Sequence, residues 1–253
     1  MIDALSIASS GLRSEQKQID VISNNVANIQ TPGFKAGRVN FADVVVPEGN
    51  LGGTGTLTHG DGARIASTST VFTPGDVKQT GNPLDLAVNG MGFFELKGAD
   101  GNMVYTRDGQ FHTDADGNLV NVQGLELARG LQIPAGATNV QIAADGEVTA
   151  VLAGETTPSS LGAIELTTFP AADQVASIGD NNFSATDAAG APSYGKPGDA
   201  GYGQLQQGAV EMANVNMVDE MSSLVMAQRA YQLNARVLQA SDQILDTINN
   251  LRR

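Results

Sequence analysis

Apolar residues recur at every seventh position near both ends of the 253-residue chain. The N-terminal repeat consists of Leu5, Leu12, Ile19 and Val26. The C-terminal repeat consists of Met217, Leu224, Tyr231, Leu238 and Leu245. A heptad repeat places apolar side chains along one face of a helix that packs on another helix. The pattern therefore predicts helices over residues 2–29 and 217–251 that pack as a coiled coil.

Chain-breaking and capping residues mark the inner ends of these two helices. Pro32 disfavours helical backbone at Thr31, and Gly33 allows the chain to reverse. Before the second helix, either Asn214 or Asn216 is placed to cap the N-terminus, because a short side-chain oxygen can accept a free backbone N–H there.

The C-terminal helix also carries apolar residues outside its heptad repeat. This second apolar set consists of Val218, Val225, Met226, Leu233, Val237 and Ile244. One partner helix cannot cover both faces, whereas neighbouring copies of the same chain can. We therefore expect self-assembly through the heptad residues of both helices and Met221. The alternative for residues 2–29 is a helix that covers only the core of its own domain.

Residues 47–63 contain six glycines and almost no large apolar side chain. A segment that cannot bury a face is expected to be a flexible loop, or an arm that becomes ordered on a partner. The Lys-Ser/Thr pair that completes a phosphate-binding loop is missing, so the glycines do not indicate nucleotide binding.

The middle of the chain changes to short β-rich runs. We expect strands at Leu84–Val88, Phe93–Leu96, Met103–Thr106, Leu119–Val122, Val140–Ile142 and Ile164–Phe169. Asp-Gly pairs, which favour hairpin turns, begin at Asp100, Asp108, Asp116 and Asp145. This cadence predicts an antiparallel barrel-like or sandwich-like domain. Residues 170–204 are expected to be turns and extended chain, and residues 205–210 one more strand.

These elements together predict an α+β protein. The terminal helices form a discontinuous core domain of residues 1–35 and 208–253. An extended or loop segment covers residues 36–80 and includes the glycine-rich arm 47–63. The β-rich outer domain covers residues 81–207.

The charge distribution separates the ends from the middle. The chain has a net charge of −13, but residues 1–35 hold three basic and three acidic side chains, and residues 208–253 hold four and five. Nearly neutral ends can pack closely, while an acidic middle favours water. The acidic balance argues against nucleic acid as a partner. A signal-peptide pattern and an apolar run of membrane-spanning length are both missing, so we expect no membrane insertion.

Few residues carry candidate chemistry. Cysteine is absent, and the two histidines, His59 and His112, lack partners at zinc-ligand spacing. Asp114, Asp116 and Asn118 superficially resemble a calcium loop, but a hairpin turn fits this stretch better because Gly117 is misplaced. We therefore expect no catalytic residues, no metal and no cofactor.

The stretch that ends the first helix matches a known signature. Residues 23–35 read Ser-Asn-Asn-Val-Ala-Asn-Ile-Gln-Thr-Pro-Gly-Phe-Lys. This resembles the N-terminal signature of the bacterial flagellar rod and hook family, Asn-Asn-x-Ala-Asn-x-x-Thr-x-Gly-aromatic-Lys after a small residue. The matching positions are Asn24, Asn25, Asn28, Thr31, Gly33 and Phe34.

Two further regions resemble the same family. Residues 84–94 and 105–111 resemble its central β segment. Residues 214–216 and 228–231 resemble its C-terminal helix, with Asn216, Gln228 and Arg229 at motif positions. Order and spacing are family-like over most of the chain.

The resemblance implies a structural subunit of the flagellar basal-body rod, without catalytic activity. In this family the terminal helices form the inner layer of a helical tube, which transmits torque to the hook and encloses part of the export channel. The implied partners are further copies of the chain, other rod proteins and the hook protein, with ring or bushing proteins as additional candidates. Members are exported by the flagellar type III apparatus without cleavage and assemble across the periplasm.

The length and the stretch Leu166–Phe169 resemble the distal rod type most. A proximal rod or short hook-type subunit remains the alternative. A more remote one is a binding or enzymatic β domain on a helical stalk.

Overall fold

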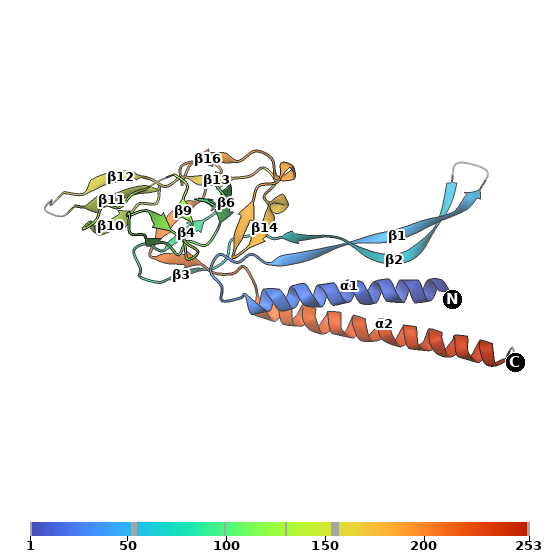
Figure 1. Ribbon diagram of the computed structural model, residues 1–253. Helices are drawn as coiled ribbons and strands as arrows, with labels where there is room; N and C mark the ends of the chain where they lie inside the picture. Colours follow the sequence, from blue (N-terminus) through green and yellow to red (C-terminus); the bar gives the residue numbers. More distant parts are fainter. Residues whose placement is uncertain (1, 52–54, 99, 130, 153–156, 252–253) are drawn as a thin grey trace. The chain divides into compact units, whose positions relative to one another are not determined.

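The computed structural model describes residues 2–51, 55–98, 100–129, 131–152 and 157–251 (Figure 1). The chain forms two compact units. Unit 1 comprises Met1–Ala27, Gly37–Ser69 and Asn216–Arg253. Unit 2 comprises Asn28–Ala36 and Thr70–Val215. Residues 28–35 and 208–215, which we expected to belong with the helices, lie in unit 2.

Two long helices dominate unit 1. Helix α1 covers Ile2–Ala27 and helix α2 covers Met217–Leu251, and the two lie side by side (Figure 1). Both predicted helices are confirmed, with α2 at the expected bounds. Helix α1 stops two residues before the expected Ile29, because the chain turns at Asn28, whose carbonyl accepts the N–H of Thr31 at 3.0 Å. Asn216 caps α2, since its Oδ1 accepts the N–H of Val218 at 3.0 Å.

A two-stranded ribbon of β1, Gly37–Leu51, and β2, Gly55–Thr70, accompanies the helices in unit 1 (Figure 1). The described part of the segment 47–63 is therefore strand, and the interpretation as a flexible loop needs correction; residues 52–54 lie outside the described residues. Strand pairing satisfies backbone donors and acceptors without an apolar face. Small residues allow close approach: a Cβ at Gly62 would collide with Ser10 Oγ of α1.

Unit 2 is built from short strands. They are β3 Val77–Gln79, β4 Leu86–Asn89, β5 Phe94–Lys97, β6 Met103–Thr106, β7 His112–Thr113, β8 Leu119–Val120, β9 Glu126–Leu127, β10 Thr138–Ile142, β11 Glu147–Val151, β12 Ser159–Ala163, β13 Leu166–Thr168, β14 Ala176–Gly179, β15 Asn182–Ser184, β16 Ser193–Gly195, β17 Gln204–Gln207 and β18 Ala209–Glu211. Single turns of 3₁₀ helix occur at Ala172–Gln174 and Asp187–Ala189.

The strands of unit 2 form several small sheets around one larger sheet. The larger sheet has the order β14-β15-β6-β5-β9-β8-β7, and β10-β11-β12 form another. The remaining strands pair as β13-β16, β17-β4 and β18-β3. Every described pair in unit 2 is antiparallel, as predicted. These sheets are open, so the β-rich region is confirmed but a closed barrel is not what the described strands form.

Three of the four Asp-Gly pairs form the expected hairpin turns. Gly101, Gly117 and Gly146 have φ of 77°, 86° and 86°, which favours glycine. The pair at Asp108 has a different role, because a Cβ at Gly109 would collide with the carbonyl oxygen of Leu86.

The segment 204–211 also departs from expectation, since Gly208 at φ 72° divides it into two strands. Residues 170–204, expected to be irregular, contain β14, β15 and β16 in addition to turns.

Unit 2 has its own core. The larger apolar cluster centres on Leu86, Phe94 and Leu96, none of which is measurably exposed. An aromatic cluster contains Phe93, Phe169 and further rings that meet edge to face. Edge-to-face contacts are favourable for aromatic rings, so few aromatic residues suffice to close this region.

Candidate functional site

Helix α2 leaves much of its apolar surface uncovered. Val218, Met226 and Leu233 are 75%, 63% and 61% exposed. The whole second apolar set is exposed, namely Val218, Val225, Met226, Leu233, Val237 and Ile244. Contiguous exposed apolar surface is typical of interaction sites in soluble proteins. We call this set the open face of α2.

The heptad residues are covered only in part. Seven of them are half-buried: Leu5, Leu12, Ile19, Val26, Leu224, Leu238 and Leu245. The other two, Met217 and Tyr231, are exposed, and so is Met221, which we also expected to take part in self-assembly. Among the described side chains of α2, Ala227 alone is fully buried. The helices approach through small residues, as where Gly11 faces Asn234 and a Cβ would lie 2.8 Å from Nδ2.

Asn25 of the family signature connects three elements of unit 1. Its Oδ1 accepts the N–H of Gly37 at 2.9 Å, and its Nδ2 donates to the carbonyl of Gly37 at 3.0 Å. The same Nδ2 donates to Glu220 Oε1 of α2 at 3.1 Å. A groove of about 350 Å³ lies beside it, lined in part by the half-exposed Phe41. Asn24, the neighbouring signature residue, is exposed.

The rest of the signature lies in unit 2. Thr31 Oγ1 donates to Asn28 Oδ1 at 3.3 Å, and Phe34 is half-buried. The N–H of Gly33 donates to the carbonyl of Glu211 at 2.8 Å. Gly33 has a φ of 71°, and a Cβ there would collide with the backbone of Asp108. Glycine is thus required at position 33 for both its conformation and its small size.

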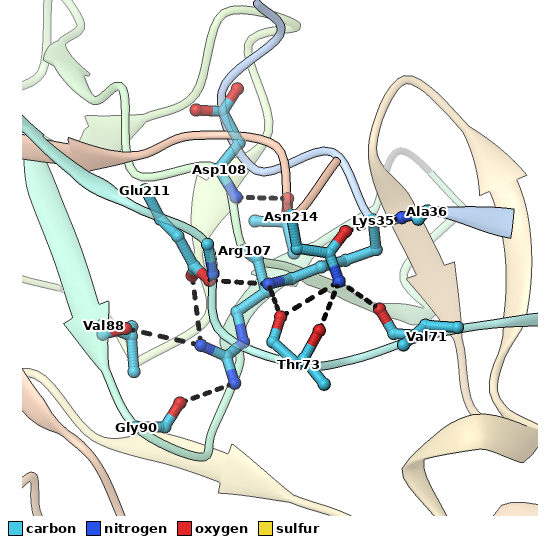
Figure 2. Close-up of polar contacts among 12 residues, drawn as sticks. Lys35, Ala36, Val71, Thr73, Val88, Gly90, Arg107, Asp108, Glu211 and Asn214 are labelled. Atoms are coloured by element: carbon cyan, nitrogen blue, oxygen red, sulfur yellow. Dashed lines mark hydrogen bonds and ion pairs between the residues drawn. The ribbon is translucent and has the colours of Figure 1, made fainter. Parts of the chain in front are cut away.

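The last signature residue, Lys35, enters a buried charge cluster (Figure 2). Lys35 Nζ lies 2.6 Å from Glu211 Oε1 and donates to the carbonyl of Thr73 at 2.8 Å. Arg107 Nη1 lies 3.2 Å from Glu211 Oε2, and its Nη2 donates to the carbonyl of Gly90 at 2.8 Å. We call Lys35, Arg107 and Glu211 the charge cluster.

Asn214 fixes the chain beside this cluster (Figure 2). Its Oδ1 accepts the N–H of Ala36 at 2.8 Å. Its Nδ2 donates to the carbonyl of Val71 at 2.7 Å and to Thr73 Oγ1 at 2.9 Å. The expected choice between two capping residues is thereby resolved, because Asn216 caps α2 while Asn214 joins segments of unit 2.

Burial sets the electrostatics of the cluster. Burial lowers the pKa of the Lys35 ammonium, against the opposing attraction of Glu211. Burial lowers the pKa of Arg107 in the same way. The Arg107 guanidinium also lies over the Phe93 ring, 5.3 Å from its centroid, which suits a cation. The cluster contains one more cation than anion.

A second polar group in unit 2 leaves no room for a ligand. Arg129 lies over the Tyr194 ring, 4.4 Å from its centroid, and 2.6 Å from Glu165. The Tyr194 hydroxyl donates to Glu95 Oε1 at 3.1 Å. The cavity among these side chains measures about 10 Å³, the size of one water molecule. The polar side chains of this group interact with one another, so the group is structural and is not a ligand site.

The described residues offer no metal centre. No group of three or more His, Asp or Glu side chains is placed to hold an ion there. Asp114, considered for calcium, accepts the N–H of Asn118 at 2.7 Å and of Asp116 at 2.9 Å, which lowers its pKa and stabilises the hairpin turn. Across the described helices, none combines the length and apolar character needed to cross a membrane.

The charge cluster was only partly visible in the sequence. Lys35, Arg107 and Asn214 lie within family motifs, although the sequence did not predict them as site residues, and Glu211 belongs to none of those motifs. An acidic residue after Ala209 and Val210 was the available signal. Gln228 and Arg229, which the C-terminal motif indicated as site residues, are exposed on α2.

Comparison with known proteins gives consistent matches along the chain. The family described as "Flagella basal body rod protein" matches residues 5–35. "Flagellar hook protein FlgE/F/G D1 domain" matches residues 87–150, and "Flagellar basal body rod FlgEFG protein C-terminal" matches residues 206–251.

Full-length relatives agree. The flagellar basal-body rod protein FlgG of Buchnera aphidicola subsp. Acyrthosiphon pisum is 38% identical, covering 99% of this chain and 100% of the relative. FlgG of Agrobacterium fabrum is 35% identical, covering 97% of this chain and 98% of the relative. The flagellar hook-basal body complex protein FlhP of Bacillus subtilis is 29% identical over the full length of both chains.

The three family matches and the full-length relatives define a structural protein of the flagellar basal-body rod. The chain belongs to the family of flagellar basal-body rod proteins, and its place is the basal body of the flagellum. The family resemblance seen in the sequence is thus confirmed.

Proposed function

We propose that this protein is a distal rod subunit whose copies assemble through α1 and α2 into a helical tube. The observation that carries the proposal is the open face of α2, which a single chain leaves exposed to water. Burying a Val, Leu, Ile or Met side chain contributes about 1.5–3 kcal/mol. Six such side chains per α2 give a large driving force even after the loss of side-chain freedom.

Coiled-coil packing of the terminal helices is part of this proposal. The heptad residues are half-buried or exposed in one chain, so further helices can cover them. A wall in which each helix is packed on several sides resists shear, because close-packed apolar interiors deform little. Such a tube would transmit torque from motor to hook and enclose part of the export channel.

The proposal extends to partners and route. We propose that the subunit contacts other rod proteins and the hook protein, with ring or bushing proteins around it, and that it crosses to the periplasm by type III export without cleavage. The FlgG relatives support the distal type, since they are 35–38% identical over nearly the whole chain, against 29% for FlhP.

Electron microscopy of the purified protein tests assembly. Leu224→Asp and Leu238→Asp should each prevent tubes, because a buried carboxylate without a partner is strongly disfavoured. Gln239→Asp is the matched control, since it introduces the same charge at an exposed polar position of α2. Near-ultraviolet circular dichroism should show that unit 2 stays folded in all three variants. Tubes of normal length from Leu224→Asp would refute the proposal.

A further inference from the structure

The charge cluster of unit 2 depends on a single carboxylate. Lys35 and Arg107 both contact Glu211, and all three side chains are at most 3% exposed. A buried charge is strongly disfavoured unless it is paired. Without Glu211, two cations would face each other away from water. The cluster is therefore favourable only while Glu211 is in position.

Glu211 also holds several segments by backbone and side chain. Its carbonyl accepts the N–H of Gly33, and its Oε1 accepts the N–H of Gly75, both at 2.8 Å. Within the β18-β3 pair it lies opposite Val77. One residue thus joins the segment Asn28–Ala36 to the chain around residues 75–77 and to Arg107.

The contacts of Glu211 with Lys35 and Gly33 are expected to form late in folding, because the residues lie far apart in the sequence. Lys35 and Glu211 are 176 residues apart in sequence. Contacts at such separation become favourable only after the intervening chain has closed. Within the segment Asn28–Ala36 itself, the N–H of Phe34 donates a local hydrogen bond to the carbonyl of Thr31 at 3.3 Å. A single turn of this kind is weak in water.

We propose that Glu211 is a latch, so that the segment Asn28–Ala36 becomes ordered in unit 2 only when strand β18 docks. Before strand β18 packs in unit 2, the segment Asn28–Ala36 remains unordered, and the side chains of Lys35 and Arg107 remain in water. The latch concerns the folding of a single chain and does not rest on the proposed assembly.

Pulsed hydrogen exchange during refolding of the full chain tests the order of events. The amides of Phe34 and Val71 are suitable probes, because they donate to Thr31 and Ala36 and not to Glu211. Met212 follows β18 directly, and its N–H donates to the carbonyl of Asp76. We expect the amides of Phe34 and Val71 to become protected in the same kinetic phase as that of Met212. Protection of Phe34 and Val71 in an earlier phase than Met212 would show that no latch exists.

Variants test the charge argument in the native state. Glu211→Gln should lower the protection of Phe34 and Val71 at least tenfold, while Glu147→Gln, which changes an exposed carboxylate of β11, should leave it unchanged. Adding Lys35→Met to Glu211→Gln removes one buried cation and should restore part of the protection. Unchanged protection in Glu211→Gln, or a double variant no better than the single one, would overturn the proposal. If Glu211→Gln does not fold, recovery of folding in the double variant supports it, and failure of both overturns it.

Discussion

Units 1 and 2 differ in how far their apolar side chains are buried. In unit 2, Leu86, Phe94 and Leu96 are fully covered by the same chain. In unit 1, Val218 and Met226 remain mostly exposed although α1 and the ribbon are present. Unit 2 thus has a core that its own residues complete, whereas unit 1 leaves apolar side chains of α2 exposed.

Phe94→Ala should have the largest effect and should be confined to unit 2. Phe94 is 0% exposed and meets Phe111 edge to face at 5.2 Å. Removing a buried Phe costs about 3–5 kcal/mol of unfolding free energy. Denaturant unfolding should show this loss, whereas Met91→Ala, at a side chain 64% exposed, should change it by less than about 0.5 kcal/mol. Equal losses would mean that the core of unit 2 is not complete.

Gly33→Ala should be the next most damaging change. Position 33 combines a positive φ with a collision against Asp108, whereas Gly81 has a φ of 76° and open space around its Cβ position. Gly81→Ala should therefore cost about 1–2 kcal/mol for backbone conformation alone. Gly33→Ala should cost clearly more in thermal or denaturant unfolding. Similar values for the two variants would show that the close packing of the signature on Asp108 is unimportant.

Leu233→Ser should affect assembly and leave the single chain almost unchanged. Leu233 belongs to the open face of α2 and is 61% exposed. Loss of about 2 kcal/mol of burial between copies raises the critical concentration for tube formation about 30-fold. Sedimentation across a concentration series measures this, and Gln232→Ser is the control at a neighbouring exposed polar residue. A reduced unfolding free energy of the monomer would instead place Leu233 in its own core.

Alkaline pH should give the smallest effect, and it concerns the charge cluster. Burial holds the pKa of Lys35 below 10.5 in the folded chain, while the unfolded chain keeps the ordinary value. Between these two values the unfolded state binds more protons, so the contribution of Lys35 to stability rises with pH and is constant below the folded pKa. Urea unfolding of wild type and Lys35→Met between pH 8 and about 10.5 should show the difference moving in favour of wild type. A shift in favour of the variant would contradict a lowered pKa.

Strong periodic patterns were sufficient to predict the helices and several strands. Helix α2 was predicted at its actual bounds, because its apolar repeat and the cap at Asn216 are both local signals. The β1–β2 ribbon was missed, since strand pairing within 47–63 leaves no apolar period to detect. Strands of two residues, such as β7 and β9, are too short to carry any pattern.

The charge cluster could not be predicted for a different reason. Lys35 and Glu211 are 176 residues apart, so no local sequence pattern indicates their contact, and Glu211 is positioned by the pairing of β18 with β3. The signature residues were recognisable as a motif, but their division between two units was not. Asn25 acts in unit 1, while Gly33 and Lys35 act in unit 2.

The amide of Asn25 imitates a neighbouring strand at the first residue of β1. It offers one acceptor and one donor to the N–H and carbonyl of Gly37, as a paired backbone would. Aspartate lacks the donor and would repel Glu220, and glutamine is one methylene too long. Asn25 therefore fixes the position along α1 at which strand β1 begins, so a shift of the ribbon by one residue would break both hydrogen bonds to Gly37.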